Sequence, residues 1–194
     1  MKSLLKKKPE ALLLTVLLLV TLSLRLWNLG YSHFYGDETK TLYLDKTVSA
    51  YDFFITQRKA PLQFFVSWVM EKVSGGYSEF WIRLPFSMAG ILSVFALYFL
   101  VREWFGRKAA FFSAFLFSLS GFYIAFSRIA QYQSLYIIFG LTAVLFASLR
   151  KRHFIYTLLS GVFLGFGFLC HYDTVFFVIP VLLELFLDIE PKNF

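Results

Sequence analysis

The sequence predicts an all-α membrane protein: a polytopic helix bundle of about six transmembrane helices, with amphipathic juxtamembrane helices in its first outer loop. Of its 194 residues, 58% are hydrophobic, 21% are aromatic and only 16% are charged. A soluble domain of this length is about half apolar and about a quarter charged. The surplus apolar surface cannot all be buried in so small a core, so we expect it to face lipid.

The positive charges lie in clusters between the apolar runs. A net charge of +7 invites a nucleic-acid interpretation, but the placement of the charges argues against it. Short basic clusters on alternate sides of apolar runs are typical of cytoplasmic loops. We therefore expect a multi-pass protein of the cell membrane, with a cytoplasmic N-terminus and no nucleic-acid partner. The clusters are Lys2, Lys6, Lys7 and Lys8; Arg102, Arg107 and Lys108; and Arg150, Lys151 and Arg152.

Six apolar runs approach the roughly 17–25 residues that cross the hydrocarbon core of a bilayer. The first also resembles a secretory signal peptide, but no cleavage site with small residues follows it. We expect a retained span, with Arg25 and Trp27 at the membrane interface. The last run is short and contains Glu184. The runs cover residues 11–29, 84–101, 109–126, 134–149, 154–170 and 174–187.

Residues 30–83 form a long segment of mixed charge between the first two runs. Its apolar stretch from Pro61 to Met70 is too short to span, and predicts an amphipathic helix on the membrane surface. With the N-terminus inside, this segment and the turns near Arg128 and Asp173 all fall outside. The sequence shows no internal repeat or linker. We expect residues 1–194 to form one membrane domain, with the active site in the extracytoplasmic loop 30–83.

Two adjacent carboxylates, Asp37 and Glu38, follow the first run within that loop. One carboxylate near the membrane surface could act as a general base, its pKa tuned by partial burial and by its neighbour. Either could instead hold a divalent cation through oxygen. The structural alternative is a helix start, with Asp37 as the N-cap.

Three cations are candidates for binding a phosphate. Arg58 and Lys59 immediately precede the predicted surface helix, where they could neutralise a phosphate or simply contact anionic lipid. Arg128 lies at an outer turn, where it could pair with a phosphate or extend to a lipid headgroup. At the next outer turn, His171 and Asp173 could contribute to a metal site or orient a substrate, or form an ordinary polar turn.

Four segments together resemble the lipid-phosphate-sugar-dependent glycosyltransferases of the GT-C membrane fold, in the branch of the protein O-mannosyltransferases and the aminoarabinose transferases. Two departures are visible: Ala60 stands where that family has a proline, and Gln131 where many relatives have a second basic residue. The resemblance covers the chain from about residue 20 onward. The segments are Leu24–Gly30 leading to Asp37–Glu38, Lys59–Phe65, Glu79–Pro85 with Arg102–Arg107, and Ser127–Gln131.

The resemblance implies transfer of a sugar from a polyprenyl-phosphate donor to an acceptor on the outer membrane face, with inversion. Asp37 would be the general base, and Glu38 would position it or hold a metal; no other cofactor is implied. Lys59 and Arg128, with Arg58, would stabilise the leaving phosphate. The sugar and the acceptor are not specified by the sequence.

Members of that family typically have several more spans, so the resemblance covers only the N-terminal part of such an enzyme. This leaves an alternative function: a truncated, non-catalytic membrane subunit or fragment that binds lipid-linked sugar and needs a C-terminal half or a partner subunit. A transporter is disfavoured, because transporters place ionisable groups near mid-membrane. Here only Glu184 lies well inside a predicted span.

Overall fold

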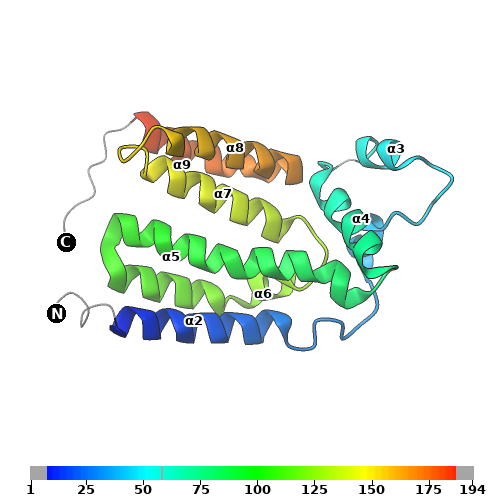
Figure 1. The fold of residues 1–194 in the computed structure, drawn as a ribbon, viewed down its shortest axis with the longest axis horizontal. Coiled ribbons are helices and arrows are strands. Elements are labelled where there is room, and N and C mark those ends of the chain that lie inside the picture. The colour runs from blue at the N-terminus through cyan, green and yellow to red at the C-terminus, as the bar shows by residue number, and fades with distance from the viewer. Residues whose placement is uncertain (1–7, 58, 187–194) are drawn as a thin grey trace.

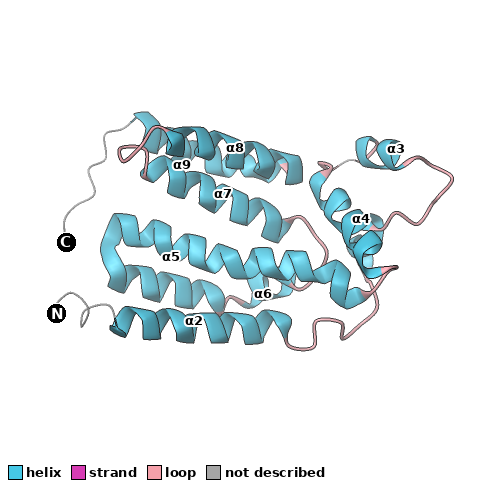
Figure 2. Ribbon diagram, viewed as in Figure 1, coloured by secondary structure: helices cyan, strands magenta, loops and turns pink. Residues whose placement is uncertain are grey.

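The structure is a computed structural model that describes residues 8–57 and 59–186. Every regular element in this part of the chain is helical, with no strand (Figure 2), so the predicted all-α class is confirmed. The α-helices and the two short 3₁₀ helices, η1 and η2, are α2 (Lys8–Leu26), η1 (Gly36–Thr41), α3 (Ala50–Ile55), α4 (Leu62–Ser74), α5 (Glu79–Ser118), α6 (Gly121–Ser127), α7 (Gln133–Ser148), α8 (Ile155–Cys170), η2 (Tyr172–Thr174) and α9 (Val175–Phe186).

Helix α5 is a hairpin of two antiparallel legs (Figure 1). The chain leaves helical geometry at Gly106, which has φ = 81° and ψ = 179°. Glycine adopts this positive φ without the steric cost that a side chain would add. Val94 and Tyr98 on the first leg then share a buried cluster with Ala110 and Ala114 on the second. The predicted basic loop between the second and third runs is therefore this sharp turn.

The long helices lie side by side as rods (Figure 1). Helix α5 contacts α2, α6 and α7, and α7 in turn contacts α8 and α9. The shorter helices α3 and α4 lie across one end of these rods, beside η1. We call this end, which also carries η2, the loop end of the bundle. The opposite end carries Gly106, and we call it the kink end.

Helices occupy all six predicted apolar runs, with one difference. The third run is not continuous: the second leg of α5 ends at Ser118, and α6 begins anew at Gly121 with the Ser120 hydroxyl capping it. In the described part of the chain, α5 is the helix long and apolar enough to cross a membrane. Helices α7 and α8 have 16 residues each and fall short of that length. Six membrane crossings therefore stay a prediction.

Helix α4 confirms that a helix follows Pro61. Its buried positions are mostly polar, Gln63, Ser67 and Glu71 beside Phe64, whereas Val73 is exposed, so its amphipathic character stays a prediction. The helix ends at Gly75, whose left-handed φ of 73° is typical of a glycine that closes a helix. Its location on a membrane surface stays a prediction.

Arg25 does not lie at the interface, as the sequence had suggested. It is fully buried, whereas Trp27 is 80% exposed. One guanidinium nitrogen of Arg25 donates to the backbone carbonyl of Ser118 at 3.2 Å, and the group lies 5.5 Å from the Tyr123 ring centroid. Arg25 therefore joins α2 to α5 and α6 inside the bundle, and its stem does not extend to the surface.

Small residues hold α7 against its neighbours. A side chain on Gly140 would come within 2.2 Å of the Phe177 ring of α9. Ser160 of α8 donates to the backbone carbonyl of Ala143 at 2.8 Å. This close packing fixes the position of the start of α7 relative to the end of α8, where two candidate site residues lie.

Candidate active site at the loop end

Asp37 lies in the first turn of η1, with its carboxylate partly open to solvent. Lys40 donates to one carboxylate oxygen at 2.5 Å, and Lys59 donates to the other at 3.3 Å. The hydrogen bond from Lys40 has the largest effect on the pKa of Asp37, followed by the hydrogen bond from Lys59, and both hold that pKa below its usual value. The side chain is 40% exposed. Asp37 is therefore a carboxylate at neutral pH that a hydroxyl group could approach.

Lys59 reaches Asp37 from the segment that leads into α4. Pro61 follows directly before the helix, where its fixed φ and missing N–H suit a helix start. The Lys59 ammonium also lies 4.9 Å from the centroid of the Tyr132 ring, within the range of a cation–π interaction. The ammonium is thus shared between a carboxylate and an aromatic face, and it is only partly buried.

Tyr132 connects Lys59 to the turn between α8 and α9, which holds His171 and Asp173. Its ring is stacked on the ring of His171, with centroids 3.8 Å apart and an interplanar angle of 12°. His171 Nδ1 lies 3.1 Å from the Asp173 carboxylate and accepts the backbone N–H of Asp173 at 3.2 Å. The structure therefore brings Asp37, Lys59 and the His171–Asp173 turn into one cluster, through Tyr132.

His171 is neutral in this cluster at neutral pH. Burial lowers the pKa of the imidazole, and the nearby Lys59 ammonium lowers it too, while Asp173 acts in the opposite direction. A neutral imidazole can stack on Tyr132 without placing a second cation beside Lys59. Stacking and the capping of η2 account for His171, so its arrangement supports an orienting role more than metal binding.

Glu38 points away from Asp37, into the protein, and is 1% exposed. Arg83, at the start of α5, donates to its two oxygens at 2.8 Å each. The carboxylate also accepts the backbone N–H groups of Ala130 at 2.9 Å and Tyr35 at 3.3 Å. Glu38 therefore ties η1 to α5 and to the turn after α6.

Arg83 completes this connection with three backbone carbonyls of the loop after α2. Its two terminal nitrogens donate to Leu29 at 3.2 Å, Ser32 at 3.0 Å and His33 at 3.1 Å. The guanidinium is 1% exposed, and its fork of donors suits a carboxylate and several carbonyls at once. This buried pair fixes the backbone on which Asp37 stands.

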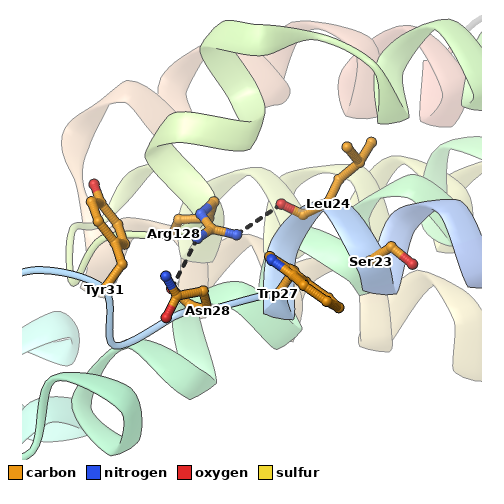
Figure 3. Close-up of a pocket in the computed structure, with 6 residues that line it drawn as sticks. All are labelled: Ser23, Leu24, Trp27, Asn28, Tyr31 and Arg128. Carbon is orange, nitrogen blue, oxygen red and sulfur yellow. Dashed lines mark hydrogen bonds between the residues drawn. The ribbon is translucent and has the colours of Figure 1, made fainter.

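Arg128 lies in a separate pocket at the C-terminal end of α2 (Figure 3). Its guanidinium donates to the backbone carbonyls of Leu24 at 3.0 Å and Asn28 at 3.2 Å. Trp27 and Tyr31 line the same pocket, which has a volume of ≈ 530 Å³. No contact between Arg128 and Asp37 or Lys59 is present, and Tyr31 stands between this pocket and the Arg83 pair, since its ring lies 5.6 Å from both guanidinium groups.

A divalent cation does not fit between Asp37 and Glu38. Both Glu38 oxygens already accept hydrogen bonds from Arg83 and from backbone N–H groups. The described part of the chain also holds no group of three or more His, Cys, Asp or Glu side chains arranged for a metal ion. Arg58, the remaining candidate, lies outside the described residues.

Sequence reasoning assigned no role to Tyr132 or Arg83. Arg83 directly precedes the apolar run 84–101, on the predicted outer side, where basic residues are less common. That unusual placement could have identified Arg83 as a residue with a specific partner. Tyr132 had no such signal, since its importance comes from contacts with residues 73 positions before it and 39 after it along the chain.

Comparison with known proteins identifies the family of this chain. A model of the dolichyl-phosphate-mannose-protein mannosyltransferase family matches residues 58–193. That match covers well over half of the chain. The chain belongs to this family.

The matched part of this mannosyltransferase-family chain includes Lys59, Arg83, Arg128 and the His171–Asp173 turn, but begins after Asp37. The chain is also 26% identical over 200 residues to YkcB, a candidate mannosyltransferase of Bacillus subtilis (strain 168). That similarity covers 94% of this chain and 27% of the relative. No solved structure matches the chain. The family, together with the apolar helix α5, indicates a membrane location.

Proposed function

We propose that this chain carries the base and the phosphate-binding cation of a glycosyltransferase, which transfers a sugar from a polyprenyl-phosphate donor to an acceptor hydroxyl on the extracytoplasmic face of the membrane. The observation that carries the proposal is the contact between Lys59 and the half-exposed Asp37 carboxylate, at 3.3 Å. The contact places a base and a phosphate-binding cation in one cluster, where a donor sugar that enters between them would have the base on one face of its anomeric carbon and the cation on the phosphate side.

In the proposed step, Asp37 accepts the proton of the acceptor hydroxyl as its oxygen bonds to the anomeric carbon. The bond from that carbon to the phosphate oxygen breaks on the opposite face, and the polyprenyl phosphate leaves with the electron pair. The anomeric configuration is inverted. Lys59 stabilises the negative charge that grows on the phosphate.

Donor binding would also activate Asp37. In the absence of a donor, Lys40 and Lys59 lower the pKa of the Asp37 carboxyl, which makes it a weaker base. A phosphate that attracts the Lys59 ammonium removes one of these two cations from the carboxylate. The pKa of Asp37 then rises toward its usual value, and its strength as a base increases at the moment the donor is in place.

Glu38 and Arg83 act as positioning residues in this proposal. Neither reaches the open side of the cluster, because both are buried against each other and the backbone. Arg128 is a second candidate for binding phosphate, since its only described polar contacts are two backbone carbonyls and it meets no carboxylate. With α5 crossing the membrane, the loop end faces outward and the N-terminus lies in the cytoplasm.

The proposal is tested by following label from a radiolabelled polyprenyl-phosphate sugar in membranes that express this chain. We expect the native chain to transfer label, and Asp37→Asn to lose transfer by about 10²–10⁴-fold, the usual contribution of a general base. Asp45→Asn is the matched control, because Asp45 lies in the same loop and its hydrogen bonds within the described part of the chain are both to Thr47. Equal loss in both variants would remove Asp37 as the base.

A second candidate function is a membrane subunit that binds lipid-linked sugar without transferring it. The observation in its favour is that the chain spans about a quarter of the length of its Bacillus subtilis relative. Retention of the labelled donor by the native chain, with no transfer and no effect of Asp37→Asn, would support this candidate over the enzyme.

A further inference from the structure

A second pocket, of ≈ 590 Å³, lies at the kink end of the bundle, at the opposite end of α5 from the candidate active site. It surrounds the turn between the two legs of α5. Gly106 contributes backbone only, and a side chain built there would meet nothing within 4 Å. The lining residues are Arg102, Phe105, Gly106, Arg107 and Lys108.

The pocket has more positive than negative charge. Glu10 of α2 is the carboxylate that meets it, 3.1 Å from Arg102 and 3.2 Å from Arg107. One carboxylate thus faces two guanidinium groups. Lys108 is exposed, and it has no ion-pair partner in the described part of the chain. Three cations and one carboxylate therefore leave a net charge of about +2 around an open space.

The neighbouring acid does not change this balance. Glu103 precedes the turn by three residues, but it accepts two hydrogen bonds from Arg152, at 2.7 and 2.8 Å. Glu103 therefore neutralises Arg152, in the loop between α7 and α8. The net positive charge at the pocket is unchanged by it.

The depth of the pocket indicates what lies beside it. At the 1.5 Å rise of an α-helix, the leg from Glu79 to Gly106 is about 40 Å long. A bilayer with its headgroup regions is about 40–45 Å thick. When the loop end lies at the headgroups of one leaflet, the kink end reaches the headgroups of the other. Phe105, 60% exposed, then lies at the boundary between headgroups and acyl chains.

We propose that the pocket at the turn of α5 binds the phosphate headgroup of an anionic phospholipid. Basic pockets between membrane helices are suited to such headgroups. Lys108 and Arg107 would contact the phosphate, and Phe105 would pack on the first part of the acyl chains. The proposal shares with the proposed function the placement of α5 in a membrane, and uses none of its chemistry.

The test is native mass spectrometry of the detergent-purified chain, incubated with phosphatidylglycerol or with phosphatidylcholine. We expect the native chain to retain phosphatidylglycerol in preference to phosphatidylcholine. Lys108→Gln should weaken retention of phosphatidylglycerol about fivefold, the equivalent of the ~1 kcal/mol that one basic residue contributes near an anionic surface. Because the readout is lipid binding, the result stands whether or not the chain transfers sugar.

Two further variants make the test specific. Glu10→Gln should strengthen retention, because it removes the carboxylate that neutralises Arg102 and Arg107. Lys72→Gln, an equal loss of charge at an exposed position of α4 at the loop end, should change nothing. Equal retention of the two lipids by the native chain would overturn the proposal. So would equal weakening by Lys72→Gln, or displacement of the lipid by an equal concentration of inorganic phosphate.

Discussion

The two ends of the helix bundle neutralise their cations in different ways. At the kink end, each described arginine of the basic clusters meets a glutamate. At the loop end, Arg128 donates to backbone carbonyls, and Lys59 meets a partly exposed carboxylate that it shares with Lys40. The kink-end pairs are Arg102 and Arg107 with Glu10, Arg152 with Glu103, and Arg150 with Glu184.

This difference separates guanidinium groups that have a glutamate of their own from cations that retain charge for a ligand. Arg152, which has Glu103 to itself, has less to gain from a phosphate than Arg102 and Arg107, which share Glu10. Lys59 keeps its charge accessible, because an aromatic face and a solvated carboxylate oppose it only weakly. The buried Glu38–Arg83 pair at the loop end is closed to a ligand, and it stabilises the loop that carries the accessible groups.

The largest effect that we expect comes from breaking the buried Glu38–Arg83 ion pair at the loop end. Glu38→Gln leaves the Arg83 charge buried without its counter-ion, so the free energy of unfolding should fall by about 3–5 kcal/mol. Denaturant unfolding of the purified chain in detergent measures this. Glu10→Gln at the kink end is the comparison, and it should cost below about 1 kcal/mol because its arginine partners are partly exposed. Equal losses would erase the contrast between the two ends.

Lys59→Gln should weaken binding of a polyprenyl phosphate to the purified chain about tenfold. A charge-assisted hydrogen bond contributes about 1.5–3 kcal/mol, and part of that is lost to solvent at this half-open position. Titration of the chain with polyprenyl phosphate in detergent gives the dissociation constant. Lys72→Gln has the same charge change on α4 and should bind as the native chain does. Unchanged binding by Lys59→Gln would place the phosphate elsewhere.

Tyr132→Leu should release the Lys59 ammonium from its aromatic support, whereas Tyr132→Phe keeps the ring and should behave as the native chain does. An exposed cation–π contact contributes about 0.5–1 kcal/mol, so polyprenyl phosphate should bind about two- to fivefold more weakly to Tyr132→Leu. The rate at which an amine-reactive reagent labels Lys59, followed by peptide mass spectrometry, should rise in the same variant. Identical labelling in Leu and Phe variants would mean that the ring does not hold Lys59.

The smallest effect concerns pH. The hydrogen bond from Lys40 is the largest single cause that lowers the pKa of Asp37, so Lys40→Gln should raise that pKa toward its usual value. A base with a higher pKa becomes protonated at higher pH, so the acid limb of sugar transfer should move upward. A pH profile of transfer measures the shift. Lys46→Gln, whose ammonium meets Glu71, should leave the limb in place.

Sequence reasoning recovered most of the fold, because apolar runs of helical length and basic turns are local features. It located all six helical runs and the helix after Pro61. It was wrong about Arg25, since a charge near the end of an apolar run extends to the surface unless neighbouring helices enclose it. Ser118 and Tyr123, which enclose Arg25, lie about a hundred residues away, and no local pattern connects them.

The sequence by itself determined the helical class, the apolar surplus, the acidic pair and the cations at the turns, because these depend on composition and on neighbours along the chain. Only the tertiary structure decided which carboxylate stays accessible. Adjacent Asp37 and Glu38 separate because Arg83 and the Ala130 N–H draw Glu38 inward, while lysines hold Asp37 at the surface. A distant buried cation distinguishes two acids that the sequence presents as equivalent.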